Sequence, residues 1–260
     1  MSYGVIGVGA IGAAIVTGLC ESAQDAPRIV LSPRNADRAA ELASRFPTVR
    51  VAASNQEVID SSSVLLLCVR PQDARSVLAG LTFSSQQPVV SMMAGISIAA
   101  LRELIAPAQD IARAIPLPSV AARDGATPIF PPIAAARALF DRLGASIEIP
   151  TEPAFEATSA STATIAAYFA YLDAICRWLI AHGVSDTAAK RQVAASFAGL
   201  AARLRGQQPD FHELARDHAT RGGTNEQFLG VLHQARVFET VDEGLNRVLE
   251  RLTNRSARNL

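Results

Sequence analysis

The feature that most constrains this sequence is a regular alternation of short apolar runs and helical patterns over its first 150 residues. The apolar runs predict strands at residues 3–8, 28–32, 49–52, 63–69, 87–92, 110–115, 126–130 and 145–149. The segments between them predict helices at residues 11–22, 35–45, 55–60, 72–80, 97–105 and 132–143. Residues 63–69 are apolar almost throughout, as a strand covered on both faces must be. The alternation therefore predicts an α/β fold with a doubly wound parallel sheet.

After Pro150 the pattern becomes entirely helical. Periodic apolar positions predict helices at residues 153–181, 186–205, 210–218 and 225–252, with no strand between them. We expect the last residues, 253–260, to fray. The sequence thus predicts two domains, an α/β domain over 1–150 and an all-helical domain over 151–260.

Composition and charge exclude several classes of function. The 24 basic side chains balance the 24 acidic ones, so no electrostatic feature favours nucleic acid or an anionic membrane as partner. The sequence has no basic segment ahead of its first apolar run and no uninterrupted apolar run of about 20 residues, so we expect a cytoplasmic protein without a membrane partner. The three cysteines lie far apart and the four histidines lack metal-ligand spacing, which predicts free thiols and no metal site.

Residues 7–12 read Gly-Val-Gly-Ala-Ile-Gly and stand between the first predicted strand and the first predicted helix. Gly7 permits a tight turn, Gly9 lets a pyrophosphate approach the backbone, and Gly12 lets the helix and strand pack closely. The free N–H groups at the helix start attract phosphate, which adds Ala10 and Ile11 to the predicted cofactor-binding residues. The pattern predicts a Rossmann-type dinucleotide-binding domain; the alternative is an incidental glycine turn.

The end of the second predicted strand indicates which dinucleotide is bound. An NAD site usually carries Asp or Glu there to hold the ribose 2′-hydroxyl. This sequence instead has Ser32, Arg34 and Asn35, whose hydroxyl, guanidinium and amide groups can hold a 2′-phosphate. The sequence therefore favours NADP(H). In the alternative interpretation Asn35 only caps the next helix and Arg34 faces water.

Five further motifs resemble, in order and spacing, those of the pyrroline-5-carboxylate reductases. Cys68-Val69-Arg70-Pro71-Gln72 resembles the family's Val-Lys-Pro-Gln, and residues 90–96 (Val-Ser-Met-Met-Ala-Gly-Ile) are similar to its Ser-Ile-Ala-Ala-Gly. Arg113-Ala114-Ile115-Pro116 resembles its Arg-x-Met-Pro, Gly125-Ala126-Thr127 its Gly-x-Thr, and Gly222-Gly223-Thr224-Asn225 its Gly-Gly-Thr-Thr. The resemblance covers essentially the whole chain. It implies cofactor contacts for Cys68, Val69, Arg70, Pro71, Ala94, Gly95 and Pro116.

The sequence departs from the family pattern mainly where the substrate is expected. Leu117-Pro118-Ser119 replaces Asn-Thr-Pro, and residues 161–167 replace the family's Ser-Gly-Ser-Gly-Pro-Ala-Tyr. The family's final threonine, thought to lie beside the substrate ring nitrogen, falls on Asn225. These departures leave open which imine this chain reduces.

The segment around Gly222 and Gly223 also predicts a substrate site on its own chemistry. Thr224 with Gln227 three residues later forms a capping-box pattern ahead of an apolar helix. Free N–H groups at such a start can bind an anion, here a substrate carboxylate, and the alternative is an ordinary helix start. Arg221 is either a carboxylate clamp or a solvated side chain. We assign Thr224 and Asn225 as catalytic candidates, and Arg221, Gly222, Gly223 and Leu117 as further substrate-binding candidates.

The leading functional hypothesis is NADPH-dependent reduction of a cyclic imine such as 1-pyrroline-5-carboxylate. A β-hydroxyacid dehydrogenase is a rival, but residues 153–181 lack the lysine and glycines that such an enzyme carries on its interdomain helix. A non-catalytic NADP-binding regulator is the second rival. The resemblance implies a homodimer or higher oligomer whose intertwined helices complete each active site, and the apolar stripe of 225–252 agrees with it.

Overall fold

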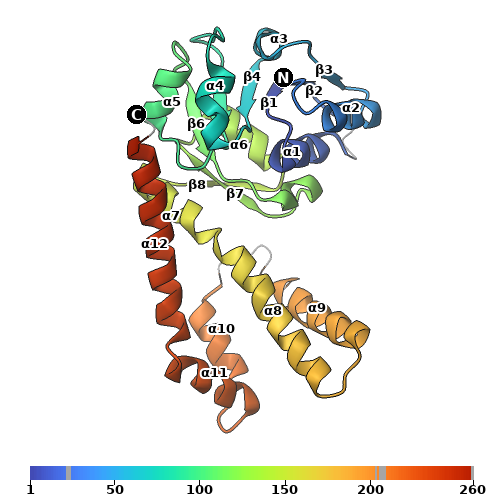
Figure 1. Cartoon of the computed structure of the whole chain (residues 1–260), viewed down its shortest axis with the longest axis vertical. Helices are drawn as coiled ribbons and strands as arrows, with labels where there is room; N and C mark the ends of the chain where they lie inside the picture. The colour runs from blue at the N-terminus through green and yellow to red at the C-terminus, as the bar shows by residue number, and fades with distance from the viewer. Residues whose placement is uncertain (22–24, 203, 205–208, 259–260) are drawn as a thin grey trace. The chain divides into compact units, whose positions relative to one another are not determined.

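The computed structural model describes residues 1–21, 25–202, 204 and 209–258. The strands are β1 (Ser2–Ile6), β2 (Arg28–Leu31), β3 (Val49–Val51), β4 (Val64–Leu67), β5 (Val89–Ser91), β6 (Ile111–Ala114), β7 (Ala126–Phe130) and β8 (Ala145–Glu148). The helices among them are α1 (Ala10–Cys20), α2 (Ala36–Arg45), α3 (Asn55–Asp60), η1 (Pro71–Asp73), α4 (Ala74–Leu78), α5 (Ile98–Leu104), η2 (Pro118–Ala122) and α6 (Ala134–Asp141), where η marks a 3₁₀ helix. The α/β alternation predicted from the sequence is confirmed (Figure 1).

The eight strands form one sheet in the order β3-β2-β1-β4-β5-β6-β7-β8. The order reverses between β1 and β4, which pair in parallel through Tyr3–Ile6 and Val64–Leu67. In an open sheet of this kind the carboxyl ends of the strands flanking the reversal frame a crevice that binds ligands. The topology therefore places the predicted glycine loop, which follows β1, at that crevice.

The expectation of a wholly parallel sheet is wrong at one strand. β7 pairs antiparallel with β6 and parallel with β8, whereas the other neighbouring pairs are parallel. A parallel neighbour requires a crossover, usually a full helix, between the strands. The segment from β6 to β7 contains only η2, which the sequence analysis did not predict, and Gly125 with φ 115° ahead of β7. The chain therefore turns back beside β6.

Side chains alternate between two apolar layers, one on each face of the sheet. In β4, Val64 and Leu66 belong to the layer under α1, α2 and α6, whereas Leu65 and Leu67 belong to the layer under α3, α4 and α5. All four residues are at most 2% exposed. A strand buried on both faces needs such a continuous apolar run, which explains why β4 was easily recognised.

The remaining helices are α7 (Glu152–Ser161), α8 (Thr164–Ala181), α9 (Asp186–Ala202), α10 (Phe211–His218), α11 (Thr224–Gln234) and α12 (Val237–Arg258). The single helix predicted over 153–181 is wrong, because α7 and α8 are separate. The Thr164 hydroxyl donates to the Ser161 carbonyl oxygen at 2.8 Å, and the N–H groups of Ala163 and Ile165 bond three residues back. Hydroxyl side chains that bond to nearby backbone compete with the regular helix.

The helix predicted over 225–252 is also divided. Arg236 adopts a left-handed φ of 53° between α11 and α12, and no glycine or asparagine there marks the break in the sequence. α12 then continues to Arg258, beyond the predicted helix end at residue 252, and the expected fraying of the tail stays a prediction. Residues 22, 203 and 205 of the predicted helices, and residues 259–260 of the predicted tail, lie outside the described residues.

The described residues fall into two compact units. One comprises Met1–Ser159 and Leu249–Leu260, and the other is Ala160–Val248. Helix α7 begins in the first unit, where Phe155 and Glu156 are buried. In the second unit α8 packs beside α9. The functional division at residue 150 stays a prediction.

One stretch, Glu152–Ala181, is long and apolar enough to cross a membrane by length and composition alone. Core helices of soluble proteins pass the same test, so one such helix is weak evidence for a membrane span.

A tight contact with η2 fixes the position of α1, the helix that follows the glycine loop. A Cβ added to Gly18 would lie 2.2 Å from the carbonyl oxygen of Val120. Arg123 closes the end of α1, because its Nε and Nη2 donate to the carbonyl oxygens of Gly18 and Glu21 at 2.7 and 2.8 Å. A basic side chain on the last carbonyls of a helix is stabilising.

We predict that Gly18→Ala destabilises the protein by about 1–3 kcal/mol, because the added methyl group must displace backbone. Gly199→Ala is the matched control, since Gly199 lies in α9 with nothing within 4 Å of an added Cβ. That control should gain about 0.5–1 kcal/mol from helix propensity. Thermal unfolding followed by circular dichroism measures both changes. Equal midpoints for the two variants would show that the α1–η2 contact is not tight.

Candidate functional site

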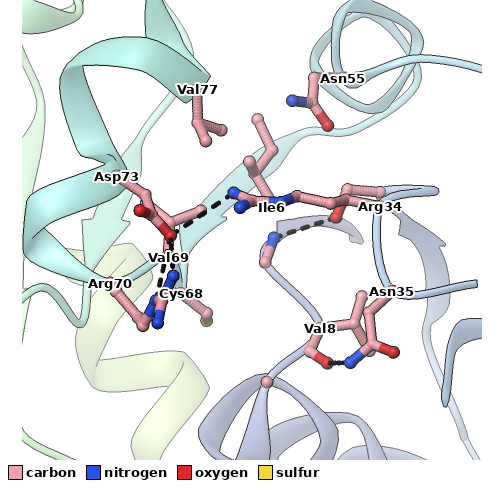
Figure 2. A pocket seen from close by; sticks show the side chains of 13 residues that line it. Ile6, Val8, Arg34, Asn35, Asn55, Cys68, Val69, Arg70, Asp73 and Val77 are labelled. Carbon is pink, nitrogen blue, oxygen red and sulfur yellow. Dashed lines mark hydrogen bonds and ion pairs between the residues drawn. The ribbon is translucent and has the colours of Figure 1, made fainter.

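A pocket of about 320 Å³ lies where the strand order reverses. Its walls come from the segments that follow β1, β2 and β4, with contributions from α3 and α4 (Figure 2). The lining residues are Ile6, Gly7, Val8, Gly9, Ser32, Arg34, Asn35, Asn55, Cys68, Val69, Arg70, Asp73 and Val77. Eight of the predicted cofactor-binding residues are among them. Of the others, Ala10, Ile11 and Gly12 form the first turn of α1, and Pro71 begins η1.

The loop after β1 passes so close to the segment after β4 that a side chain cannot be accommodated. Gly7 has φ 100°, and an added Cβ would lie 2.6–2.7 Å from the backbone of Cys68 and Val69. An added Cβ on Gly12 would lie 2.5 Å from the Gly7 carbonyl oxygen. Two of the three motif glycines are thus required by backbone packing.

Gly9 has a different role, because open space surrounds it. No heavy atom lies within 4 Å of an added Cβ, and Gly9 is the N-cap of α1 without a side-chain capping bond. The first-turn N–H groups of α1 are therefore available to an anion that approaches the backbone at Gly9. This geometry suits a pyrophosphate.

The three residues at the end of β2 divide their roles. The Ser32 hydroxyl, 2% exposed, accepts a hydrogen bond from the Gly7 N–H at 3.0 Å. The Asn35 amide nitrogen donates to the Val8 carbonyl oxygen at 2.9 Å. Both residues thus hold the glycine loop in place. The Arg34 side chain is 64% exposed and extends into the pocket, where it offers a positive charge (Figure 2).

Sequence reasoning missed Asp73, which lies opposite Arg34 in the pocket. Its Oδ2 atom accepts from Arg70 Nε and Nη2 at 3.0 and 2.9 Å and lies 3.5 Å from Arg34 Nη1. An acid three residues after an arginine at a helix start is a recognisable ion-pair pattern. Asn55 and Val77, also missed, carry no signal that separates them from ordinary surface positions.

Cys68 is partly exposed at the same pocket. Desolvation by the surrounding protein raises the pKa of the Cys68 thiol to about 12. The side chain is therefore a neutral thiol at physiological pH.

A second, smaller pocket of about 60 Å³ contains the predicted residues Ile11, Ala94 and Pro116. It is also lined by Met92, Met93, Arg113, Ala114, Ile115 and Phe155. The predicted residue Gly95 follows Ala94 with φ 71°. The carboxyl ends of β5 and β6 and the residues that follow them supply most of this lining.

Arg113 is the largest fully buried side chain of the first unit, with 1% exposure. Its Nη1 atom lies 2.8 Å from Glu152 Oε1 and 2.6 Å from Glu156 Oε1. Its guanidinium group stands 4.7 Å from the centroid of the Phe155 ring. Glu152 also accepts from the Ile98 N–H at 2.8 Å, so one buried cation joins β6, α5 and α7.

The predicted substrate residues divide between the two units. Leu117 precedes η2 in the first unit, and residues 221–225 lie in the second. Gly222 has φ 76°, and an added Cβ on Gly223 would lie 2.7 Å from Thr220 Oγ1. Asn225 Nδ2 donates to the His218 carbonyl oxygen at 3.0 Å, and Arg221 is exposed.

The capping box predicted for Thr224 and Gln227 is wrong. Helix α11 begins at Thr224 with Gly223 as N-cap and no side-chain capping bond. Glu226 supplies the reciprocal contact instead, because its Oε2 atom accepts from the Gly222 N–H at 2.7 Å. The left-handed glycine brings the backbone N–H within reach of that carboxylate.

Among the described residues, no group of three or more His, Cys, Asp or Glu side chains is placed to hold a metal ion.

The fold and the pocket define a dinucleotide-binding α/β protein with an added helical unit. Two family models match the chain: NADP oxidoreductase coenzyme F420-dependent over residues 2–95, and pyrroline-5-carboxylate reductase dimerisation over residues 152–255. A pyrroline-5-carboxylate reductase of Pasteurella multocida is 27% identical, covering 95% of this chain and 94% of the relative. The two family models and this relative together support the resemblance to the pyrroline-5-carboxylate reductases.

Solved structures show the same fold. The 1-pyrroline-5-carboxylate reductase of Streptococcus pyogenes matches with a TM-score of 0.83, 24% identity and 98% coverage of both chains. The pyrroline carboxylate reductase of Plasmodium falciparum, solved with NADP bound, matches with a TM-score of 0.80, 17% identity and the same coverage. At these identities the likeness describes the fold and not the substrate.

Proposed function

We propose that this protein reduces the C=N bond of a cyclic imine with NADPH, with 1-pyrroline-5-carboxylate as the leading substrate and a homodimer as the active form. The observation that carries the proposal is the glycine-loop pocket with Arg34 in it. An NADP oxidoreductase model matches residues 2–95 of the same chain, and the pyrroline-5-carboxylate reductase dimerisation model matches residues 152–255. The β-hydroxyacid dehydrogenase alternative lacks support, because α8 carries no lysine and no glycine.

The residues of the pocket fit NADPH. Gly9 and the start of α1 provide open backbone for the pyrophosphate, and Arg34 provides an exposed cation for the 2′-phosphate. Ala94 and Pro116 line the smaller pocket at the ends of β5 and β6, beside which we place the nicotinamide. When bound, NADPH supplies the hydride that the imine carbon accepts.

The chain's contribution to the chemistry is then placement. A protonated imine is already electrophilic at carbon, so it needs orientation and exclusion of water more than acid catalysis. We assign the substrate carboxylate to the N–H groups of Thr224 and Asn225, because the N–H groups of Gly222 and Gly223 already donate to Glu226 and to the Thr220 carbonyl oxygen. An amide cannot readily deliver a proton at neutral pH, so Asn225 orients the ring nitrogen and the proton comes from solution.

A homo-oligomer is supported by the dimerisation model over residues 152–255. The helices of the second unit expose large apolar side chains, with Phe169 and Trp178 both 60% exposed and Phe228 51% exposed. Exposed apolar surface of this extent marks an interface. The centre of α8 also carries the ion pair of Asp173 and Arg177, at 2.9 Å, which disfavours a lipid environment. We therefore assign the exposed apolar side chains of the second unit to contact with a second copy, and the protein to the cytoplasm.

The decisive test is turnover by the purified full-length protein with NADPH and a panel of cyclic imines, with and without a carboxylate. We expect NADPH oxidation with at least one imine and no NADP⁺ reduction with a β-hydroxyacid. Tight NADPH binding without turnover of any imine would support the regulatory alternative and contradict the proposal.

We predict that Arg34→Ala raises the Kd of NADPH about tenfold or more, because one charge-assisted contact contributes roughly 1.5–3 kcal/mol. The Kd of NADH should change little, since NADH lacks the 2′-phosphate. Fluorescence titration measures both constants. Equal losses for the two cofactors would remove Arg34 from the phosphate site.

For the substrate site we predict that Thr224→Ala mainly raises KM for a carboxylated imine. Asn225→Ala should lower kcat by no more than about a hundredfold, because the side chain orients and does not transfer a proton. Steady-state kinetics over pH measures these effects, and the rate should fall above the pKa of each imine. A pH midpoint that stays fixed across imines of different basicity would reveal an acid in the protein.

For assembly we predict a dimer or larger oligomer at micromolar concentration by light scattering. Trp178→Glu, which places a charge among the exposed apolar side chains of the second unit, should shift the distribution toward monomer and reduce turnover. An active wild-type monomer at that concentration would contradict the proposed homodimer.

A further inference from the structure

One wall of the nucleotide pocket carries a negatively charged side chain, Asp73. The Oδ2 atom of Asp73 lies between two guanidinium groups, at 2.9 and 3.0 Å from Arg70 Nη2 and Nε and at 3.5 Å from Arg34 Nη1 (Figure 2). All three residues line the pocket. A carboxylate in this pocket is unexpected, because the end of β2, where an NAD site usually carries Asp or Glu, has neither.

The contact with Arg34 crosses the pocket. Arg34 follows β2, whereas Arg70 and Asp73 follow β4 on the other side of β1. Arg34 is 64% exposed and Arg70 69% exposed, but Asp73 is only 22% exposed. The carboxylate is therefore the fixed partner, and the two guanidinium groups reach to it.

The two contacts of Asp73 differ in strength. Arg70 is three residues away and donates two hydrogen bonds of ordinary length, whereas Arg34 makes a single longer contact. A long contact between exposed groups is weak. A phosphate carries up to two negative charges and three acceptor oxygens, so it is the stronger partner for Arg34. Asp73 would keep Arg70 when Arg34 leaves.

We propose that Asp73 is a specificity-determining residue, which acts as the counter-ion of Arg34 in the nucleotide-free protein and competes with the 2′-phosphate of NADPH for that guanidinium. The inference rests on the proposed function, because it assigns the 2′-phosphate to Arg34. NADH lacks the 2′-phosphate, so it binds with the Arg34–Asp73 contact intact. Asp73 thus narrows the preference for NADPH over NADH.

The test uses Asp73→Asn, which keeps the shape of the side chain and removes its charge. The probes are 2′,5′-ADP and 5′-AMP, which differ in the 2′-phosphate, with binding measured by calorimetry on the full-length protein. We expect 2′,5′-ADP to bind about three- to tenfold tighter and 5′-AMP to change less than about twofold, with the gain shrinking at high salt. The ratio of kcat/KM for NADPH over NADH should rise in parallel.

Asp186→Asn is the matched control. Asp186 pairs with Lys190 at 2.9 Å on the surface of α9, so the same charge is lost outside the pocket. This control should leave the preference for 2′,5′-ADP unchanged. In an Arg34→Ala background, the effect of Asp73→Asn on the affinity for 2′,5′-ADP should fall below about twofold. The Arg34 guanidinium, for which the Asp73 carboxylate and the 2′-phosphate compete, is then absent.

The inference is overturned by weaker or unchanged binding of 2′,5′-ADP by Asp73→Asn, by an equal change for both probes, or by a gain that persists without Arg34. If wild-type protein binds neither NADPH nor 2′,5′-ADP, the proposed function itself fails and this inference fails with it. If wild-type protein binds NADPH and Asp73→Asn changes nothing, only the role of Asp73 is rejected.

Discussion

The close approach of the loop after β1 to the segment after β4 is the constraint on which the nucleotide pocket depends. With Gly7 at φ 100° and an added Cβ 2.6 Å from Cys68, the two backbones meet without a side chain between them. This contact brings the start of α1 to the carboxyl edge of the sheet, where the N–H groups face the pocket. Ser32 and Asn35 then fix the loop from the β2 side through Gly7 and Val8. Arg34, between these two fixed residues, is left to extend into the pocket.

At the smaller pocket, a cluster of buried charged side chains around Arg113 sets the position of the wall. Arg113 is held by two carboxylates and by the face of Phe155, in a place where an unpaired cation would cost several kcal/mol. Glu152 extends the cluster to the start of α5 through the Ile98 N–H. The position of the wall that contains Ala94 and Pro116 is therefore set by electrostatics as much as by apolar packing. Two different forces, glycine packing and buried ion pairing, shape the two ends of the proposed cofactor site.

The sequence predicted the α/β unit well because its signals are local. The apolar run of β4 and the glycines before α1 each determine their structure through neighbours in the chain. The antiparallel β7 was missed although a parallel neighbour needs a crossover, and no helix was predicted between the strands at 110–115 and 126–130. The break at Arg236 was missed because its left-handed conformation has no glycine to mark it. Asp73 was missed for a similar reason: its partner Arg34 comes from another strand, so only the folded sheet brings the charges together.

Because the Cys68 thiol stays protonated, it is protected from oxidation by peroxides. Peroxides react with thiolates, and a thiol with a pKa of about 12 holds almost none at neutral pH. Cys68 lines the nucleotide pocket, where a sulfenic acid or a mixed disulfide would fill space and alter the wall beside Val69. Desolvation thus keeps the sulfur inert in a position where its oxidation would block the site.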